Sequence, residues 1–416
     1  MAHRFDDWGR PTAAFAFRDV DLAVDRISAP AGALLVDPFA GSGRSGSFVV
    51  GRGDRFAGIE AHPLMGELAT LKLARPGSPA GLVESAGELL ARAAARRRRA
   101  SIGREDPVVR RFVPEPALVE LAALRDVHER VEGPWGAHLR WLVIDLLRRA
   151  TGSSWPYRSA VRRREPPHDI GALLLARAAA MADDISAAPR AADGAVVAGD
   201  ARDPRAWDGI EPLAVAGSVS SPPYLNQVSY AEVTRVELHF LGLVSSWREL
   251  TERVGRHLVA SSTQQVTRVR AQHALEDLAR YPGTTATVEA LAGRLARERA
   301  ERPRGKAYDV LVPCYFADLA AVLRNLHAAM APGATAAWVL GDSAPYDVHV
   351  DTPALVGLLA EEVGFEVVDD VLLRERGGRW RGVGRRHARR LSERLLVFRR
   401  PGWAAQAPLP GFDKPS

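Results

Sequence analysis

A short motif in this sequence has residue types that could hold an amino group in place. A run of apolar and small residues at 214–220 leads into Ser221, Pro222, Pro223 and Tyr224. Two consecutive prolines cannot continue a central strand or form the interior of a helix, so the motif should leave a sheet edge as a rigid, extended segment. The Ser221 hydroxyl and the Pro222 carbonyl could accept hydrogen bonds from two amino hydrogens, which would fix the direction of a weakly nucleophilic, conjugated nitrogen. Tyr224 could stack on the ring that carries this nitrogen.

A second group of residues could bind a molecule that contains adenosine. Residues 34–43, Leu-Leu-Val-Asp-Pro-Phe-Ala-Gly-Ser-Gly, are typical of a buried strand that ends in an acid and a glycine-rich turn before a helix. The next expected strand ends in Glu60, which could accept hydrogen bonds from both ribose hydroxyls. A third expected strand ends in Asp200, which could accept one from the adenine amino group. One acid at such a position is often only a helix cap, but acids at successive strand ends favour a cofactor site.

The segment 37–43 resembles the cofactor-binding motif of DNA amino-methyltransferases, and residues 221–242 resemble the catalytic motif and following helix of one bacterial group of these enzymes. Segments at 315–319, 332–343 and 364–367 are similar to the same group. The sequence departs from the motif at Arg44, where threonine is common. The resemblance implies S-adenosylmethionine as the cofactor, bound by Asp37, Pro38, Phe39, Ala40, Gly41, Gly43, Glu60 and Asp200. It implies catalysis by Ser221, Pro222, Pro223 and Tyr224.

The resemblance also implies a substrate in double-stranded DNA. The methylated atom would be an exocyclic amino nitrogen of a base that is flipped out of the duplex, because that atom cannot be reached inside it. In the family, serine at the position of Ser221 is associated with cytosine N4, whereas aspartate or asparagine more often accompanies adenine N6. We therefore expect a site-specific DNA methyltransferase that acts on cytosine N4, with adenine N6 as the alternative. A restriction endonuclease or another defence protein would be a partner in that setting.

Three other functions compete with this one. Some RNA amino-methyltransferases share a prolyl-prolyl-aromatic motif, although theirs usually begins with aspartate or asparagine. A cytosine-C5 methyltransferase needs a cysteine nucleophile, but the single cysteine, Cys314, lacks the flanking residues of that motif and is expected to be buried and structural. A nucleic-acid-binding protein with a decayed methyltransferase fold would fit Arg44, but not the intact residues of the two motifs.

The arrangement of apolar runs predicts the elements that position these residues. Strand-like runs alternate with helical patterns, which indicates an α/β protein. We expect a class I (Rossmann-like) methyltransferase fold with a mixed seven-stranded sheet and two helical insertions. The expected strands lie at 33–36, 56–59, 195–198, 213–219, 335–340, 365–373 and 394–398. The expected segments are core with the cofactor motif (1–74), a helical insertion (75–193), core with the catalytic motif (194–230), a second helical insertion (231–304), core (305–400) and a flexible tail (401–416).

Two regions are candidates for contact with nucleic acid. The resemblance implies that target recognition lies between the two motifs, as in one permutation of the family, so residues 75–193 are the candidate region; a helical subdomain for folding or dimerisation is equally consistent. Residues 374–390 hold eight arginines, and their glycines favour a loop or hairpin. This loop could contact phosphates and an unpaired base, or it could be only a solvated basic loop. The residues expected to make such contacts are Arg374, Arg376, Arg379, Trp380, Arg381, Arg385 and Arg386.

Composition sets broader limits. With 47% hydrophobic and 25% charged residues, the chain of 416 residues is typical of a globular protein. Its net charge of +6 favours a polyanionic partner, but a general preference for arginine explains the charge equally well. The eleven histidines show no paired metal-ligand spacing, so we expect no metal. We expect a cytoplasmic protein, because no apolar run could span a bilayer and no secretory signal is recognisable.

Overall fold

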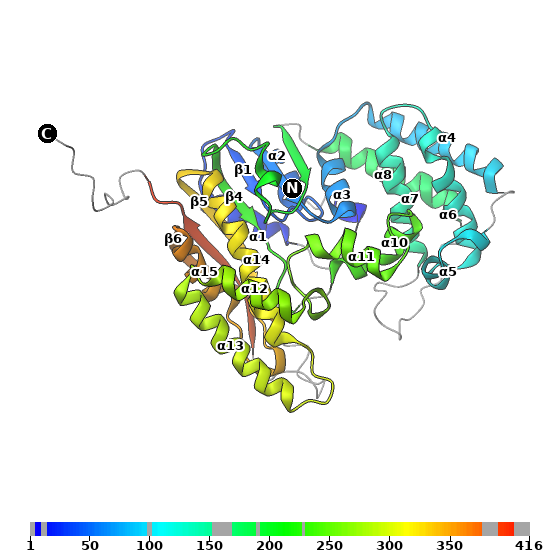
Figure 1. Ribbon diagram of the computed structural model, residues 1–416. Coiled ribbons are helices and arrows are strands. Elements are labelled where there is room, and N and C mark those ends of the chain that lie inside the picture. The colour runs from blue at the N-terminus through cyan, green and yellow to red at the C-terminus, as the bar shows by residue number, and fades with distance from the viewer. Residues whose placement is uncertain are drawn as a thin grey trace.

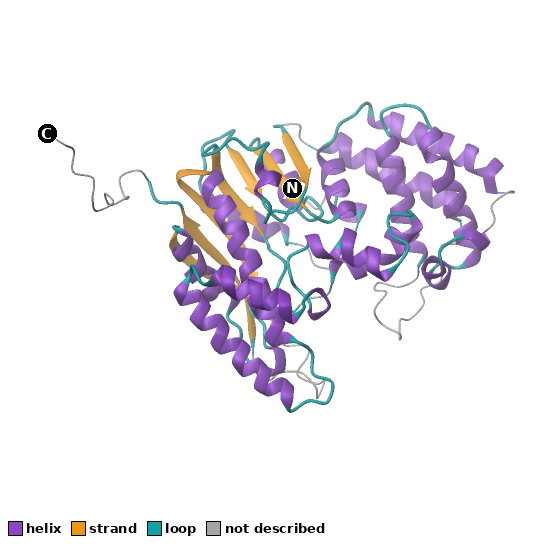
Figure 2. Ribbon diagram, in the orientation of Figure 1, coloured by secondary structure: helices purple, strands orange, loops and turns teal. Residues whose placement is uncertain are grey.

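The computed structural model describes residues 5–9, 15–97, 102–151, 169–188, 192–226, 229–376 and 390–402. It has two parts, a sheet with helices on its faces and a group of helices beside it (Figure 1). The strands lie in the first part, and the second part consists of helices joined by loops (Figure 2). Within the described ranges, no helix has both the length and the apolar composition needed to cross a membrane.

Seven strands form one mixed sheet in the order β3-β2-β1-β4-β5-β7-β6. Strand β7 is antiparallel to both of its neighbours, and the other pairs of adjacent strands are parallel. This topology confirms the predicted class I methyltransferase fold. The strands are β1 (Leu34–Asp37), β2 (Arg55–Glu60), β3 (Gly194–Ala198), β4 (Val215–Ser220), β5 (Met330–Gly341), β6 (Glu366–Arg376) and β7 (Leu391–Arg399).

The reversal of strand order between β1 and β4 decides where a ligand can bind. From β1 the chain continues outward to β2 and β3, and it then returns to the other side of β1 with β4 and β5. In an open parallel sheet, a crevice forms outside the carboxyl ends of the strands at such a point. Asp37 ends β1 and Ser220 ends β4, so the two motifs recognised in the sequence meet there.

Alternating apolar residues give each face of the sheet its own core. On β5, Val339 faces a cluster that includes α1 (Phe17–Ile27) and α2 (Arg44–Gly51). Trp338 faces the opposite cluster, formed with α14 (Tyr308–Ala329) and α15 (Thr352–Val363). The indole nitrogen of Trp338 donates to the Ser218 hydroxyl at 3.0 Å, which satisfies the one polar atom of this buried ring.

The helical part has a separate hydrophobic core built mainly from two stretches of chain, to which Phe5 and Trp8 of the N-terminal segment also contribute. The first stretch lies between β2 and β3 and follows α3 (Pro63–Leu73), which also packs on this core. Its helices are α4 (Pro79–Arg97), α5 (Pro107–Phe112), α6 (Glu115–Val127), α7 (Gly136–Ala150) and α8 (Ile170–Ala187). The second stretch contributes α9 (Tyr230–Val233), α10 (Arg235–Phe240) and α11 (Trp247–Arg253).

The second predicted insertion, 231–304, is divided between the two parts of the molecule. Its first half joins the helical core, but α12 (Arg268–Leu278) and α13 (Pro282–Ala300) pack against α14 on the sheet (Figure 1). The cause is the distribution of apolar side chains: Phe240 belongs to the helical core, whereas Leu278 and Val288 belong to the core of the sheet.

Candidate functional site

One cavity lies at the carboxyl ends of β1 and β4 and has a volume of about 300 Å³. It brings together most residues of the two predicted groups, although the two motifs are far apart in the sequence. The predicted cofactor residues that line it are Asp37, Pro38, Phe39, Ala40, Gly41, Glu60 and Asp200. The predicted catalytic residues Ser221, Pro222, Pro223 and Tyr224 all line it as well.

Asp37 connects the two motifs. Its Oδ1 accepts hydrogen bonds from the Phe39 amide at 2.9 Å and from the Ser220 hydroxyl at 2.6 Å, and its Oδ2 accepts one from the Ser45 hydroxyl at 2.5 Å. Burial raises the pKa of Asp37 to about 6, because loss of solvent disfavours the charged form more strongly than these three bonds favour it. Ser220 immediately precedes Ser221, so one carboxylate fixes both the turn after β1 and the start of the predicted catalytic motif.

Glu60 holds the glycine-rich turn against the end of β2. Its Oε2 accepts a hydrogen bond from the Gly41 amide, and its Oε1 accepts one from the His62 amide, each at 2.7 Å. Gly41 has a φ of 54°, a left-handed conformation that glycine adopts without strain. Burial raises the pKa of Glu60 to about 7. The ionised carboxylate has further lone pairs, so it can also accept hydrogen bonds from hydroxyl groups of a ligand in the cavity.

Gly43 is not among the cavity-lining residues, although we expected it to contact the cofactor. It caps the start of α2 with a φ of 78°, and an added Cβ would lie 2.6 Å from the Cα of Ala69 on α3. Gly43 therefore allows α2 and α3 to approach each other closely. The two glycines of the turn look alike in the sequence, and only the contact with Ala69 separates their roles.

Replacing Gly43 by alanine is expected to lower the free energy of unfolding by about 2 to 4 kcal/mol, because the new methyl group meets backbone in addition to straining φ. Gly32 is a matched control: its φ is 74°, but an added Cβ would have nothing within 4 Å. Gly32→Ala should cost only about 1 kcal/mol. Urea unfolding without ligand measures both values. Equal losses would show that the α2–α3 contact is not tight.

Arg44 attaches the N-terminal segment to the cavity. Its guanidinium donates to Asp6 Oδ1 at 2.6 Å and to the carbonyl oxygen of Phe15 at 2.5 Å. Phe15, Ala16 and Asp19 then form part of the cavity wall. Arg44, which departs from the motif that the sequence resembles, thus holds the N-terminal wall of the cavity in place. The sequence did not predict this wall, and the departure at Arg44 was the only indication of it.

The helical part closes another side of the cavity with buried polar pairs. His62 Nε2 lies 2.7 Å from the Thr234 hydroxyl, and burial lowers the pKa of His62 to about 4, so this ring is neutral near pH 7. Arg148 forms an ion pair with the buried Glu237 at 2.8 Å. His62, Thr234 and Arg148 all line the cavity, and none was predicted to do so.

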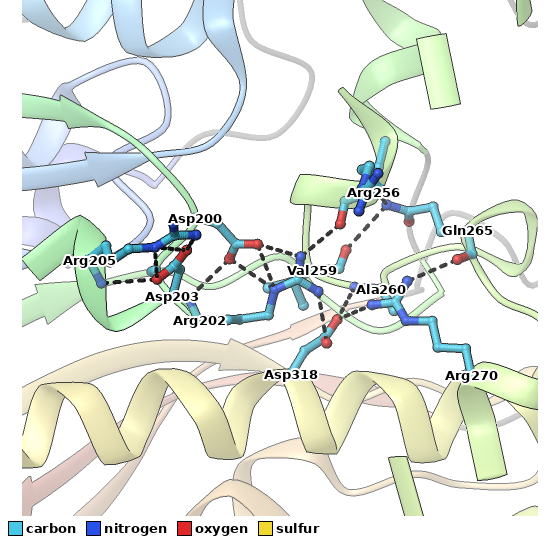
Figure 3. Close-up of polar contacts among 12 residues, drawn as sticks. Asp200, Arg202, Asp203, Arg205, Arg256, Val259, Ala260, Gln265, Arg270 and Asp318 are labelled. Atoms are coloured by element: carbon cyan, nitrogen blue, oxygen red, sulfur yellow. Dashed lines mark hydrogen bonds and ion pairs between the residues drawn. The ribbon is translucent and has the colours of Figure 1, made fainter. Parts of the chain in front are cut away.

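Asp200 lies at the cavity wall beyond β3, and its carboxylate already has a partner. Its Oδ1 accepts a hydrogen bond from Arg202 Nε at 2.9 Å, and its Oδ2 accepts one from an Arg202 terminal nitrogen at 2.6 Å (Figure 3). A carboxylate has four lone-pair sites, so it can hold Arg202 and still accept a ligand hydrogen. Its predicted contact with an adenine amino group stays a prediction.

Tyr224 of the predicted catalytic motif packs tightly on the end of β5. A Cβ added at Gly341 would lie 2.7 Å from Tyr224 Cε2, so only glycine leaves room for this ring. The guanidinium carbon of Arg376 lies 5.1 Å from the ring centroid, within the range of a cation–π contact. Arg376 also donates to the carbonyl oxygen of Asp342 at 2.5 Å, which fixes its position. The aromatic ring of the motif is therefore held by β5 and β6.

We expected a loop or hairpin over residues 374–390; Arg374 and Arg376 lie within β6, which pairs with β7 in antiparallel orientation. β6 runs past the predicted end at 373, because cross-strand pairs such as Arg374↔Glu393 continue its ladder with β7. Arg374 donates to Asp19 Oδ2 at 2.7 Å and forms an ion pair with Glu393, and these three residues line the cavity. The other residues of the predicted contact, Arg379, Trp380, Arg381, Arg385 and Arg386, lie outside the described residues.

Cys314 is buried in α14, as predicted, with 1% of its surface exposed. Burial raises the pKa of its thiol to about 11. A cysteine nucleophile needs a lowered pKa and access to substrate, and Cys314 is not among the cavity-lining residues. These facts argue against a cytosine-C5 mechanism.

No protein-family model and no curated protein matches the sequence. Among solved structures, a protein of Thermus thermophilus provisionally named a DNA modification methylase is similar at 20% identity over 24% of this chain and 40% of that one, with a TM-score of 0.17. Its complex with S-adenosyl-L-methionine gives a TM-score of 0.18 over the same shares. This chain therefore spans less than half of the length of that protein. The rRNA methyltransferase aviRa from Streptomyces viridochromogenes is 13% identical over 94% of this chain and 87% of that one, with a TM-score of 0.32. At these identities and TM-scores, neither protein decides the function of this chain.

Proposed function

We propose that this protein transfers a methyl group from S-adenosylmethionine to the exocyclic amino nitrogen of a base flipped out of DNA, with cytosine N4 as the first candidate. The observation that carries the proposal is the shared cavity. Asp37, Gly41 and Glu60 lie in the same cavity as Ser221 and Tyr224, and the Asp37–Ser220 hydrogen bond joins the two groups. An isolated glycine turn or an isolated prolyl-prolyl motif would not support the same conclusion.

The residues at one end of the cavity fit an adenosine cofactor. A volume of about 300 Å³ lies within the usual range for small-molecule sites. Glu60 would accept hydrogen bonds from the ribose hydroxyls, and Phe39 and Gly41 would line the methionine portion. The carboxylates of Asp37 and Glu60, when ionised, would favour a positively charged ligand. When bound, S-adenosylmethionine supplies an electrophilic methyl group on a sulfonium.

The residues at the other end would orient the target nitrogen. The Ser221 hydroxyl and the Pro222 carbonyl accept its two hydrogens, which directs the lone pair of the nitrogen toward the cofactor end. Tyr224, held by Gly341 and Arg376, stacks on the base and stabilises its flipped position. Serine at position 221 supports cytosine over adenine through the family resemblance stated above.

Methyl-transfer assays with separate substrates test this proposal. The purified protein is incubated with isotope-labelled S-adenosylmethionine and either bacterial genomic DNA or total RNA, and the nucleosides are identified by mass spectrometry. We expect labelled N4-methylcytosine from DNA with the wild-type protein and none with Ser221→Ala. Labelled N6-methyladenine in DNA would show that the target atom is adenine N6 and not cytosine N4. Label in RNA alone, or none in a protein that binds S-adenosylhomocysteine, would overturn it.

A further inference from the structure

An Asp-X-Arg pattern occurs twice in succession after β3, as Asp200–Arg202 and Asp203–Arg205. The local geometry of the two pairs is the same. In each pair the arginine amide and Nε donate to the carboxylate, and a terminal nitrogen forms a short bond to Oδ2, at 2.6 Å for Arg202 and 2.5 Å for Arg205. The surroundings differ, because 16% of the Arg202 side chain is exposed and 85% of that of Arg205.

Only Arg202 of the two links distant parts of the chain. It donates to Asp318 Oδ1 on α14 at 2.8 Å and to the carbonyl oxygen of Arg256 at 2.8 Å (Figure 3). The second oxygen of Asp318 accepts from the Ala260 amide at 2.8 Å and from Arg270 on α12 at 2.7 Å. Arg202 and Asp318 therefore attach both ends of residues 256–260, which we call the 256–260 segment, to the sheet.

The 256–260 segment also has internal and apolar support. The side-chain oxygen of Gln265 accepts from the amides of Ser261 and Ser262, each at 3.0 Å, which closes the turn that follows the segment. Leu258 packs in the helical core, whereas Val259 packs in the core of the sheet. The segment thus crosses from one core to the other at a fixed position.

The 256–260 segment forms a wall of the cavity next to Asp200. His257, Leu258 and Val259 line the cavity, as do Asp200 and Ala201 from the end of β3. The two apolar side chains suit the flat face of a purine, and Glu60 at the neighbouring strand end is placed for a ribose. Arg202, which Asp200 orients, then holds this wall in position through its bonds to Arg256 and Asp318.

We infer that the 256–260 segment is the purine side of the nucleoside pocket and that Arg202 is the positioning residue that holds it there. The ligand class is an adenine nucleoside, and this inference rests on the proposed function for the identity of the complete cofactor. It gives part of the second helical stretch a role in cofactor binding. Arg202 acts through the segment and is not itself a catalytic residue.

The repeated pattern supplies a matched experiment: Arg202→Met and Arg205→Met remove the same charge from the same local geometry. We expect Arg202→Met to raise the dissociation constants of both S-adenosylhomocysteine and adenosine by about ten- to a hundredfold in calorimetric titrations, because charge-assisted hydrogen bonds that hold the wall are lost. Arg205→Met should change neither constant by more than about twofold. In methyl transfer, Arg202→Met should raise KM for the cofactor and leave kcat at saturation nearly unchanged.

Hydrogen exchange provides a readout that does not require activity. Amides of residues 256–265 should exchange faster in Arg202→Met than in Arg205→Met, and adenosine should slow their exchange in the wild-type protein. Asp318→Asn, which keeps an acceptor oxygen, should speed exchange of the same amides by a smaller amount. This variant replaces Arg202→Met in the experiment if Arg202→Met folds poorly. Wild-type adenosine affinity in Arg202→Met, or equal losses in the two arginine variants, would overturn the inference.

The outcomes separate this inference from the proposed function. Adenosine binding that depends on Arg202, without methyl transfer to any nucleic acid, would support the wall and overturn the methyltransferase. Methyl transfer with an unchanged cofactor KM in Arg202→Met would support the methyltransferase and overturn the role of Arg202 in holding the wall. A wild-type protein that binds neither adenosine nor S-adenosylhomocysteine would overturn both.

Discussion

Tyr224→Ala and Ser221→Ala are each expected to lower kcat for methyl transfer by about a hundredfold or more, while the dissociation constant of S-adenosylhomocysteine changes little. Removal of the ring takes away the surface on which the flipped base stacks, and removal of the hydroxyl takes away an acceptor that directs the nitrogen. Neither side chain belongs to the residues expected to bind the cofactor, so cofactor binding should survive. Single-turnover kinetics and calorimetric titration measure the two quantities.

Tyr224→Phe is the matched control, because it retains the ring and its packing on Gly341 and under Arg376. Most of the activity should remain in this variant. Near wild-type turnover in Tyr224→Ala and Ser221→Ala would show that the base binds elsewhere. Equal losses in Tyr224→Phe and Tyr224→Ala would show that the hydroxyl, not the ring, matters.

Cofactor affinity is expected to fall steeply as the pH decreases below about 7. Burial raises the pKa of Glu60 to about 7, so the free protein binds a proton there below that pH. A ligand whose ribose hydroxyls donate hydrogen bonds favours the ionised carboxylate, and the proton must leave before the ligand binds. The dissociation constant of S-adenosylhomocysteine should therefore be constant above about pH 8 and rise by about tenfold per pH unit below 7. Asp37, with a pKa of about 6, steepens the dependence further below that value.

Glu60→Gln tests the assignment of this titration. The amide cannot ionise, so the variant should bind more weakly at pH 8 and should lose the dependence between pH 8 and 6. Neighbouring His62 has a pKa of about 4 and does not change charge in this range. The same slope in wild-type protein and Glu60→Gln, or an affinity in the wild-type protein that does not vary from pH 8 to 6, would contradict the role of Glu60.

The sheet and the two ends of the cavity were predictable because their signals are local. Strands β1–β4 are short, largely apolar runs, and Asp37, Glu60 and Ser221 lie at or directly after the ends of such runs, where parallel strands place their functional residues. Hence the sequence predicted all seven strands, and it predicted that the cofactor motif precedes the catalytic motif along the chain. Gly43 shows the limit of such reasoning, because the sequence of the turn does not indicate that Gly43 packs against Ala69 on another helix.

The remaining cavity walls were not predictable for the same physical reason. Phe15 comes from the N-terminal segment, Arg148 from the first helical stretch, and Val259 from the 256–260 segment that follows α11. Each occupies its place because of long-range contacts, such as the bonds from Arg44 to Phe15 and from Asp318 to Ala260. A side chain that becomes a wall through tertiary contacts carries no periodicity or motif. Even Arg374, noted for its charge, was assigned to a loop or hairpin beyond the strand, because its pairing with Glu393 depends on a strand that comes later.

The helical core draws on separate stretches of chain: α4–α8 are inserted between β2 and β3, α10 and α11 follow β4, and Phe5 and Trp8 come from the N-terminal segment. No single contiguous segment of the sequence therefore contains the whole helical part. A chimera that exchanges only α4–α8 for helices of another protein would leave Val236, Leu238 and Phe240 without the surfaces that bury them. The exchange would have to include α10 and α11, which directly precede the 256–260 segment. Changes in the helical part would therefore also affect the 256–260 segment, which we propose as a wall of the nucleoside site, so the two parts cannot change independently.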